Sequence, residues 1–105
     1  MAQAVAPYQT AIQTDALGTG HAALSAAPVM QDFSGDVFIL FGDTPLITAE
    51  TLQAMLAARR SALAPAVVVL GMRPAGPNAY GRLIQAADGG LERIVEFKDA
   101  TDEEK

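Results

Sequence analysis

The residues whose types best suit chemistry are Gly42 and Asp43, which end the apolar run Val37–Phe41. Pro45 follows closely and prevents a strand from continuing. A carboxylate here can hold Mg²⁺ on a phosphate substrate, because this hard cation prefers oxygen ligands. The same carboxylate can instead form an Asx-turn leading into Pro45. The residues alone leave both interpretations open, and Asp43 is the candidate metal ligand.

A second candidate is the glycine-punctuated loop Gly18-Thr19-Gly20, which precedes a helix-favouring run. Such a loop can bind a phosphate or a base through its amide N–H groups, but it can equally be a structural turn. His21 is the only histidine, so a site built from several histidines is excluded. Without a partner acid or nucleophile, the interpretation we favour is a helix-start histidine bonded to nearby backbone.

A carboxylate within a mostly apolar strand is the third candidate. Glu96 needs a partner there, because burying an unpaired charge is costly. It can accept hydrogen bonds from a sugar hydroxyl, or it can pair with Lys98 or Arg82. Gly81 permits close approach of the backbone to a ligand, or it marks a bulge.

The elements expected to position these residues indicate an α/β fold. Continuous apolar runs at Asp36–Phe41 and Ala66–Met72 are typical of strands buried on both faces in a parallel sheet. Between them, Thr48 is a candidate N-cap for an amphipathic helix that ends by Pro65. This strand–helix–strand order predicts a βαβ unit, and ligands of such sheets lie beyond the carboxyl ends of the strands, where Asp43 stands.

The C-terminal half has a different pattern. Asp88-Gly89-Gly90 predicts a hairpin turn between strands at Arg82–Ala86 and Leu91–Phe97. The charged residues 98–105 have the character of a helix start. A short strand is also expected at Thr10–Gln13.

Composition restricts the function classes. The 105 residues suffice for one small domain, half are hydrophobic, and the net charge of −5 opposes nonspecific nucleic-acid binding. Cysteine is absent, which excludes disulfides and thiolate chemistry. Without a signal peptide or an apolar stretch long enough to span a membrane, we expect a cytoplasmic protein with no membrane partner.

Taken in order, these segments closely resemble the uridyltransferase domain of the bacterial bifunctional N-acetylglucosamine-1-phosphate uridyltransferase/glucosamine-1-phosphate acetyltransferase. The resemblance covers nearly the whole chain, from about residue 11 onward. The segments that support it are Gln13, Leu17-Gly18-Thr19-Gly20-His21-Ala22, Phe41-Gly42-Asp43-Thr44-Pro45-Leu46, Tyr80-Gly81-Arg82 and Ile94-Val95-Glu96-Phe97-Lys98-Asp99-Ala100-Thr101.

The resemblance implies a Rossmann-like nucleotidyltransferase sheet, mostly parallel, with the hairpin in its C-terminal half. It also implies transfer of a uridylyl group from UTP to N-acetylglucosamine 1-phosphate. This reaction yields UDP-N-acetylglucosamine and pyrophosphate, for peptidoglycan and lipopolysaccharide precursors. Mg²⁺ is the implied cofactor, and no catalytic nucleophile is needed. The resemblance implies three groups of site residues. Uracil would be contacted by Gln13, Gly18 and Thr19, and N-acetylglucosamine by Gly81 and Glu96. Phe41, Gly42 and Asp43 would lie along the nucleotide and sugar, with Asp43 as a ligand of Mg²⁺.

The chain also departs from this family. Phe41 stands where tyrosine is common, and Phe97 where histidine is common. A glycine-rich nucleotide loop before Gln13 is missing, as are the second metal ligand expected beyond Thr101 and the left-handed β-helix. We therefore expect residues 1–105 to be the central part of the domain, inactive in isolation, from a parent that is a homotrimer through its C-terminal domain. The alternatives are a stand-alone, non-catalytic nucleotide- or sugar-binding module, and a nucleotidyltransferase for another sugar 1-phosphate.

Overall fold

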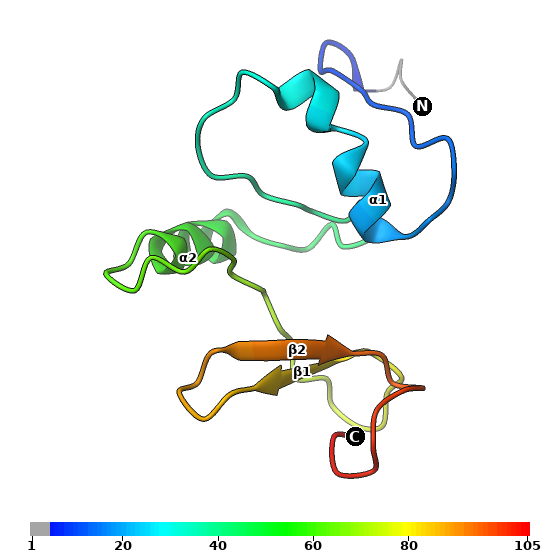
Figure 1. Cartoon of the computed structure of the whole chain (residues 1–105), viewed down its shortest axis with the longest axis vertical. Coiled ribbons are helices and arrows are strands. Elements are labelled where there is room, and N and C mark those ends of the chain that lie inside the picture. The colour runs from blue at the N-terminus through cyan, green and yellow to red at the C-terminus, as the bar shows by residue number, and fades with distance from the viewer. Residues whose placement is uncertain (1–4) are drawn as a thin grey trace. The chain divides into compact units, whose positions relative to one another are not determined.

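The computed structural model describes residues 5–105 (Figure 1). The chain divides into two compact units, Met1–Leu52 and Gln53–Lys105, which we describe separately. The elements follow the order α1 (Thr19–Leu24), the 3₁₀ helix η2 (Ala27–Met30), α2 (Ala49–Arg59), β1 (Arg82–Gln85) and β2 (Leu91–Val95). The class is thus α/β, as expected.

The predicted hairpin is confirmed in the second unit. Strands β1 and β2 pair antiparallel, from Arg82 opposite Val95 to Gln85 opposite Leu91. In the connecting turn, the Gly90 N–H donates to Asp88 Oδ1 over 2.9 Å, and Gly89 has a φ of 84°. Only glycine adopts this conformation at little cost, which explains the turn sequence.

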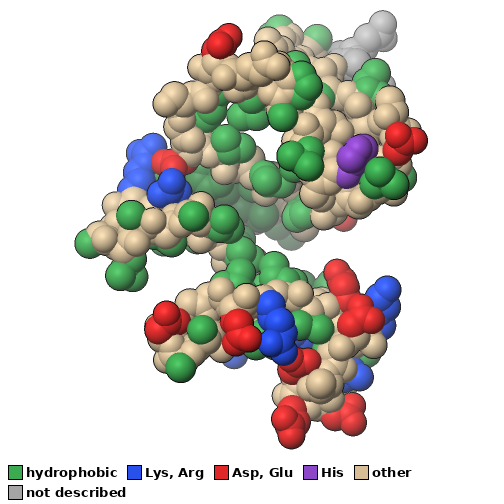
Figure 2. Space-filling model, in the orientation of Figure 1, with side chains coloured by type: hydrophobic (Ala, Val, Ile, Leu, Met, Phe, Trp, Pro, Cys, Tyr) green, Lys and Arg blue, Asp and Glu red, His purple; other side chains and the backbone are tan. Residues whose placement is uncertain are grey.

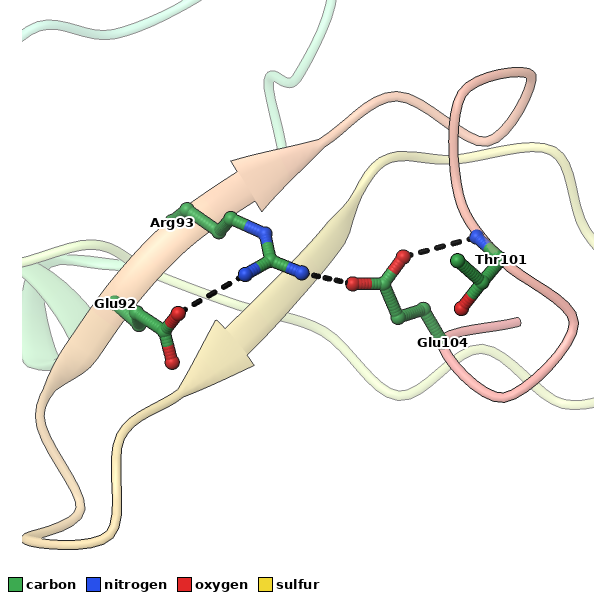
Figure 3. Close-up of polar contacts among 4 residues, drawn as sticks. All are labelled: Glu92, Arg93, Thr101 and Glu104. Atoms are coloured by element: carbon green, nitrogen blue, oxygen red, sulfur yellow. Dashed lines mark hydrogen bonds and ion pairs between the residues drawn. The ribbon is translucent and has the colours of Figure 1, made fainter.

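A β-bulge interrupts the hairpin between Ile84 and Gln85, and Glu92 on β2 has no partner in the register. Consecutive strand residues normally point to opposite faces, and a bulge breaks this alternation. Figure 3 shows the result: Arg93 Nη1 donates to Glu92 Oε1 over 2.9 Å. The other end of the Arg93 guanidinium is paired with Glu104 in the C-terminal tail.

The tail forms a hydrogen-bonded turn at residues 102–104 where the sequence predicts a helix start, and its first residues are bonded as at a helix N-terminus. Thr101 N–H donates to Glu104 Oε2 over 2.9 Å, and Glu104 N–H donates to the Thr101 carbonyl over 3.2 Å. In a capping box, the carboxylate of a glutamate accepts from the backbone N–H of a threonine or serine three residues before it, and Glu104 and Thr101 form this half of the motif. The ion pair between Arg93 and Glu104 therefore links this turn to the hairpin (Figure 3).

Helix α2 is also predicted correctly at its start, and Thr48 is its N-cap. The Thr51 N–H donates to Thr48 Oγ1 over 3.3 Å, and the Leu52 N–H donates to the Thr48 carbonyl over 3.2 Å. Glu50 in the first turn has a lowered pKa, chiefly because its carboxylate accepts from its own backbone N–H and then from Thr48. The helix ends at Arg59, before the expected limit at Pro65.

Three predicted strands are wrong for this structure. Residues 36–41, 66–72 and 10–13 are not strands, and within the described residues β1 and β2 form the only sheet. A strand needs backbone hydrogen-bond partners on a neighbouring segment, and the described part of the chain offers none to these runs. The expected burial fails as well, since Ile39 is 65% exposed and Val67 71% exposed. The mostly parallel sheet therefore stays a prediction.

The lack of pairing leaves almost no core. Among residues 5–105 only Ala100 is buried, with 7% of its surface exposed. Figure 2 shows many hydrophobic side chains on the visible surface. In the part of the chain that the structure describes, no helix has the length and apolar character needed to cross a membrane.

The N-cap of α2 generates a first prediction. Replacing Thr48 with alanine removes the side-chain acceptor for the Thr51 N–H and should destabilise α2 by about 1 kcal/mol. Circular dichroism and amide exchange of residues 49–52 measure the loss. Thr48→Ser should retain most of the helix, and Thr10→Ala in an exposed loop should change nothing. Unaltered exchange in Thr48→Ala would contradict this role.

The capping box at Thr101 generates a second prediction, on pH. The pKa of Glu104 lies below its ordinary value of 4.5, first because of the Thr101 N–H and then because of Arg93. A lowered folded-state pKa means that the stabilisation is complete above pH 4.5 and is lost as pH falls through the folded-state value. Acidification below pH 4.5 should therefore raise the exchange rate of the Thr101 amide, as NMR can measure. Glu104→Gln should abolish this pH dependence, whereas Glu103→Gln should leave it intact.

Candidate functional site

Gln13 and the glycine loop come together in the first unit. Gln13 Nε2 donates to the Gly18 carbonyl over 3.1 Å and lies 3.0 Å from His21 Nδ1. Gln13 and His21 are both half-buried. His21 thus meets a side chain, which corrects the expectation that it bonds to backbone. The amide of Gln13 closes the loop onto the start of α1.

Gly18 is the residue just before α1, with a φ of 97°. A side chain there would be strained, although no atom lies within 4 Å of the position that a Cβ would take. Thr19 is the first residue of the helix and is exposed. The Gly18 backbone is therefore open on the side where a Cβ would lie.

The turn that contains Phe41, Gly42 and Asp43 is stabilised by Thr44. The Thr44 N–H donates to the Phe41 carbonyl over 3.2 Å, and Thr44 Oγ1 donates to the same oxygen over 2.9 Å. Within residues 5–105 the Asp43 carboxylate has no hydrogen bond or ion pair, so the Asx-turn interpretation is wrong here. Gly42 and Asp43 are exposed, and the carboxylate is available to a ligand.

Gly81 and Glu96 lie together at the open end of the hairpin. The ladder ends with Arg82 opposite Val95, so Gly81 and Glu96 occupy the next position in the same register. A Cβ on Gly81 would lie 3.4 Å from the Val95 carbonyl oxygen. The Glu96 carbonyl accepts from the N–H groups of Asp99 and Ala100, over 2.9 and 3.0 Å, which fixes the backbone beyond β2.

Neither of the two alternative partners proposed for the Glu96 carboxylate, Arg82 and Lys98, is paired with it. Arg82 Nη1 donates to Asn78 Oδ1 over 2.9 Å and to the Tyr80 carbonyl over 2.6 Å. In the described part of the chain, neither Arg82 nor Lys98 forms an ion pair with Glu96. The Glu96 side chain is exposed and free to accept from hydroxyl groups.

Two features of the second unit are missed by reasoning from sequence. Arg82 Cζ and Lys105 Nζ lie 5.1 and 5.2 Å from the centre of the Phe97 ring, within range for cation–π attraction. An open groove of about 930 Å³ runs between residues 67–72 and β1. There a Cβ on Gly71 would lie 2.6 Å from Leu83 Cδ1, so the apolar run approaches β1 closely. The one sequence signal for these contacts is that Gly71 and Phe97 stand in apolar segments, which indicates that each packs against another part of the chain.

The predicted site residues thus form three local groups. Gln13, Gly18 and Thr19 make one and Phe41–Asp43 another, and no hydrogen bond or ion pair among the described residues of the first unit joins them. Gly81 and Glu96 make the third, in the second unit. Residues 5–105 hold no cluster of three or more His, Cys, Asp or Glu side chains suited to a metal ion. A metal here would need ligands from a substrate in addition to Asp43.

The chain is similar to curated bacterial proteins over nearly its whole length. The bifunctional protein GlmU of Paramagnetospirillum magneticum is 55% identical over 101 residues, which are 96% of this chain and 22% of that protein. That of Rhodospirillum rubrum is 55% identical over 105 residues, which are 100% of this chain and 23% of the relative. That of Jannaschia sp. is 55% identical over 104 residues, which are 98% of this chain and 22% of that protein.

No family profile matches the chain. No solved structure matches it significantly either. The chain spans less than a quarter of the length of the curated relatives that it matches, and the match extends over nearly all of its own residues. This chain is therefore a relative of one segment of the bifunctional GlmU proteins.

Proposed function

We propose that this chain forms the uridine- and sugar-contacting part of a uridyltransferase that makes UDP-N-acetylglucosamine from UTP and N-acetylglucosamine 1-phosphate. The observation that supports this most is the 55% identity to bifunctional GlmU proteins over nearly the whole chain. In the proposed reaction, a phosphate oxygen of the sugar phosphate attacks the α-phosphorus of UTP, and the bond to the departing pyrophosphate breaks. The product would serve cell-wall precursor synthesis in the cytoplasm.

The bonding of Gln13 supports uracil as its ligand. Its amide nitrogen donates to the Gly18 carbonyl and lies 3.0 Å from His21 Nδ1, so both amide N–H groups have an acceptor in the tautomer that leaves Nδ1 without a proton. The group that remains is Oε1, which can only accept. Uracil presents an N–H donor at N3, whereas cytosine presents an acceptor at the same position. Gln13 in this orientation is therefore suited to uracil and unsuited to cytosine.

Asp43 fits the proposed role of a magnesium ligand. Mg²⁺ in nucleotide sites is commonly held by one or two carboxylates together with substrate phosphates, and an exposed carboxylate without a protein partner meets that need. The ion, when bound, would neutralise charge on the phosphates. The Phe41–Thr44 turn would fix the direction of Asp43, and Gly42 would let the nucleotide approach the backbone.

Gly81 and Glu96 fit contacts to N-acetylglucosamine. They are neighbours at the end of the hairpin, where Glu96 offers an exposed carboxylate as acceptor for sugar hydroxyls. Gly81 has no side chain to obstruct a ring beside it. A change of sugar specificity, to another sugar 1-phosphate, would be decided by the same pair.

Magnesium binding gives a third prediction. We expect UDP-N-acetylglucosamine to bind the chain more tightly with Mg²⁺ than without it, as measured by NMR titration. Asp43→Asn should remove about tenfold of affinity, corresponding to ~1.4 kcal/mol, and only in the presence of Mg²⁺. Asp32→Asn, at another exposed aspartate, is the matched control and should keep the Mg²⁺ effect. An undiminished Mg²⁺ effect in Asp43→Asn would rule out this ligand.

A fourth prediction concerns turnover by the chain alone. Charge on the reacting phosphates would be incompletely neutralised by residues 1–105, so we expect no appreciable pyrophosphate release from UTP and N-acetylglucosamine 1-phosphate. A full-length bifunctional GlmU protein, such as that of Rhodospirillum rubrum, serves as the positive control. Pyrophosphate release by the chain would refute this expectation.

A further inference from the structure

We infer that His21 is a positioning residue that holds the Gln13 carboxamide in one orientation and thereby sets its selectivity for uracil. This inference rests on the proposed function for its ligand, but its structural part concerns only residues of this chain. The observation behind it is that one amide nitrogen, Gln13 Nε2, lies within bonding distance of two acceptors.

The orientation of the amide follows from donor and acceptor chemistry. The Gly18 carbonyl can only accept, so the Gln13 atom 3.1 Å away must be the nitrogen. The second N–H of that nitrogen then points to His21 Nδ1 at 3.0 Å. An amide nitrogen can only donate, so this contact is a hydrogen bond in the tautomer that carries the ring proton on Nε2 and leaves Nδ1 as the acceptor. Both amide donors are thereby used, and Oε1 is fixed on the other side.

The first turn of α1 holds both acceptors in place. The Gly18 carbonyl also accepts from the Ala22 N–H over 3.1 Å, and the His21 carbonyl accepts from Ser25 N–H and Oγ over 3.0 and 2.9 Å. Both acceptors lie within hydrogen-bond distance of the same Gln13 nitrogen, at 3.1 and 3.0 Å, so the start of α1 presents them to Gln13 together.

Loss of the ring acceptor should change selectivity more than binding. Without His21 Nδ1, the Gly18 carbonyl still holds one amide N–H, but the other becomes available to a ligand. A free N–H can donate to N3 of cytosine, which the fixed Oε1 cannot do. The expected result is a weaker preference for uridine over cytidine, rather than a general loss of nucleotide binding.

Two substitutions of His21 separate positioning from a merely structural role. Asn places an oxygen acceptor at the δ position, close to where Nδ1 lies, and Leu provides none. We expect the side-chain amide protons of Gln13 to exchange slowly with solvent in the original chain and in His21→Asn. In His21→Leu one of them should exchange fast. Ser25→Ala, which alters the same helical turn without touching the ring, is the control and should leave both slow.

The second readout is the affinity ratio of UMP to CMP. It should fall about tenfold in His21→Leu, the scale of one polar contact, and recover in His21→Asn. Slow exchange of both Gln13 amide protons in His21→Leu, or an unchanged ratio, would overturn the inference. If the original chain shows no preference for UMP, the proposed uridine function fails. The exchange of the Gln13 protons would still decide whether His21 positions the amide.

Discussion

Backbone pairing between segments is the constraint on which the rest of this structure depends. A strand forms only where a second segment offers N–H and C=O groups in register. Among residues 5–105 only the hairpin provides this, because its short turn brings two segments together. The apolar runs at 36–41 and 66–72 have no such neighbour and stay exposed. Because a sheet is what would bury them, the missing pairing also explains why Ala100 alone is buried among the described residues.

This constraint separates the candidate site residues by how they are held. Gln13 and Gly18 are joined by one hydrogen bond from a side chain to a backbone carbonyl five residues away, and Gly81 and Glu96 lie at the end of a formed ladder. Their local geometry therefore needs no larger sheet. Asp43 follows an unpaired run, and only the bonds from Thr44 define its turn. Strand pairing of residues 36–41 would therefore fix the position of Asp43, the proposed metal ligand, more than that of any other candidate site residue.

Local signals in the sequence predicted local structure well. Asp88-Gly89-Gly90 contains its own turn chemistry, and Thr48 supplies the cap that starts α2, so both elements form from residues within a few positions of each other. The strands at 36–41 and 66–72 were predicted from apolar character, which indicates where a chain would be buried but not what would bury it. For the same reason, the contacts of Phe97 with Arg82 and Lys105 could not be foreseen.

The environment of Phe97 explains how Glu96 remains available. Phe97, where the family that the sequence resembles commonly has histidine, begins the turn after β2 and is half-buried, whereas Glu96 is exposed. Arg82 and Lys105 both lie within cation–π range of the Phe97 ring, and Arg82 also donates to Asn78. An aromatic ring that binds both cations keeps them from neutralising the carboxylate, so this departure from the family pattern is compatible with a sugar-binding role for Glu96.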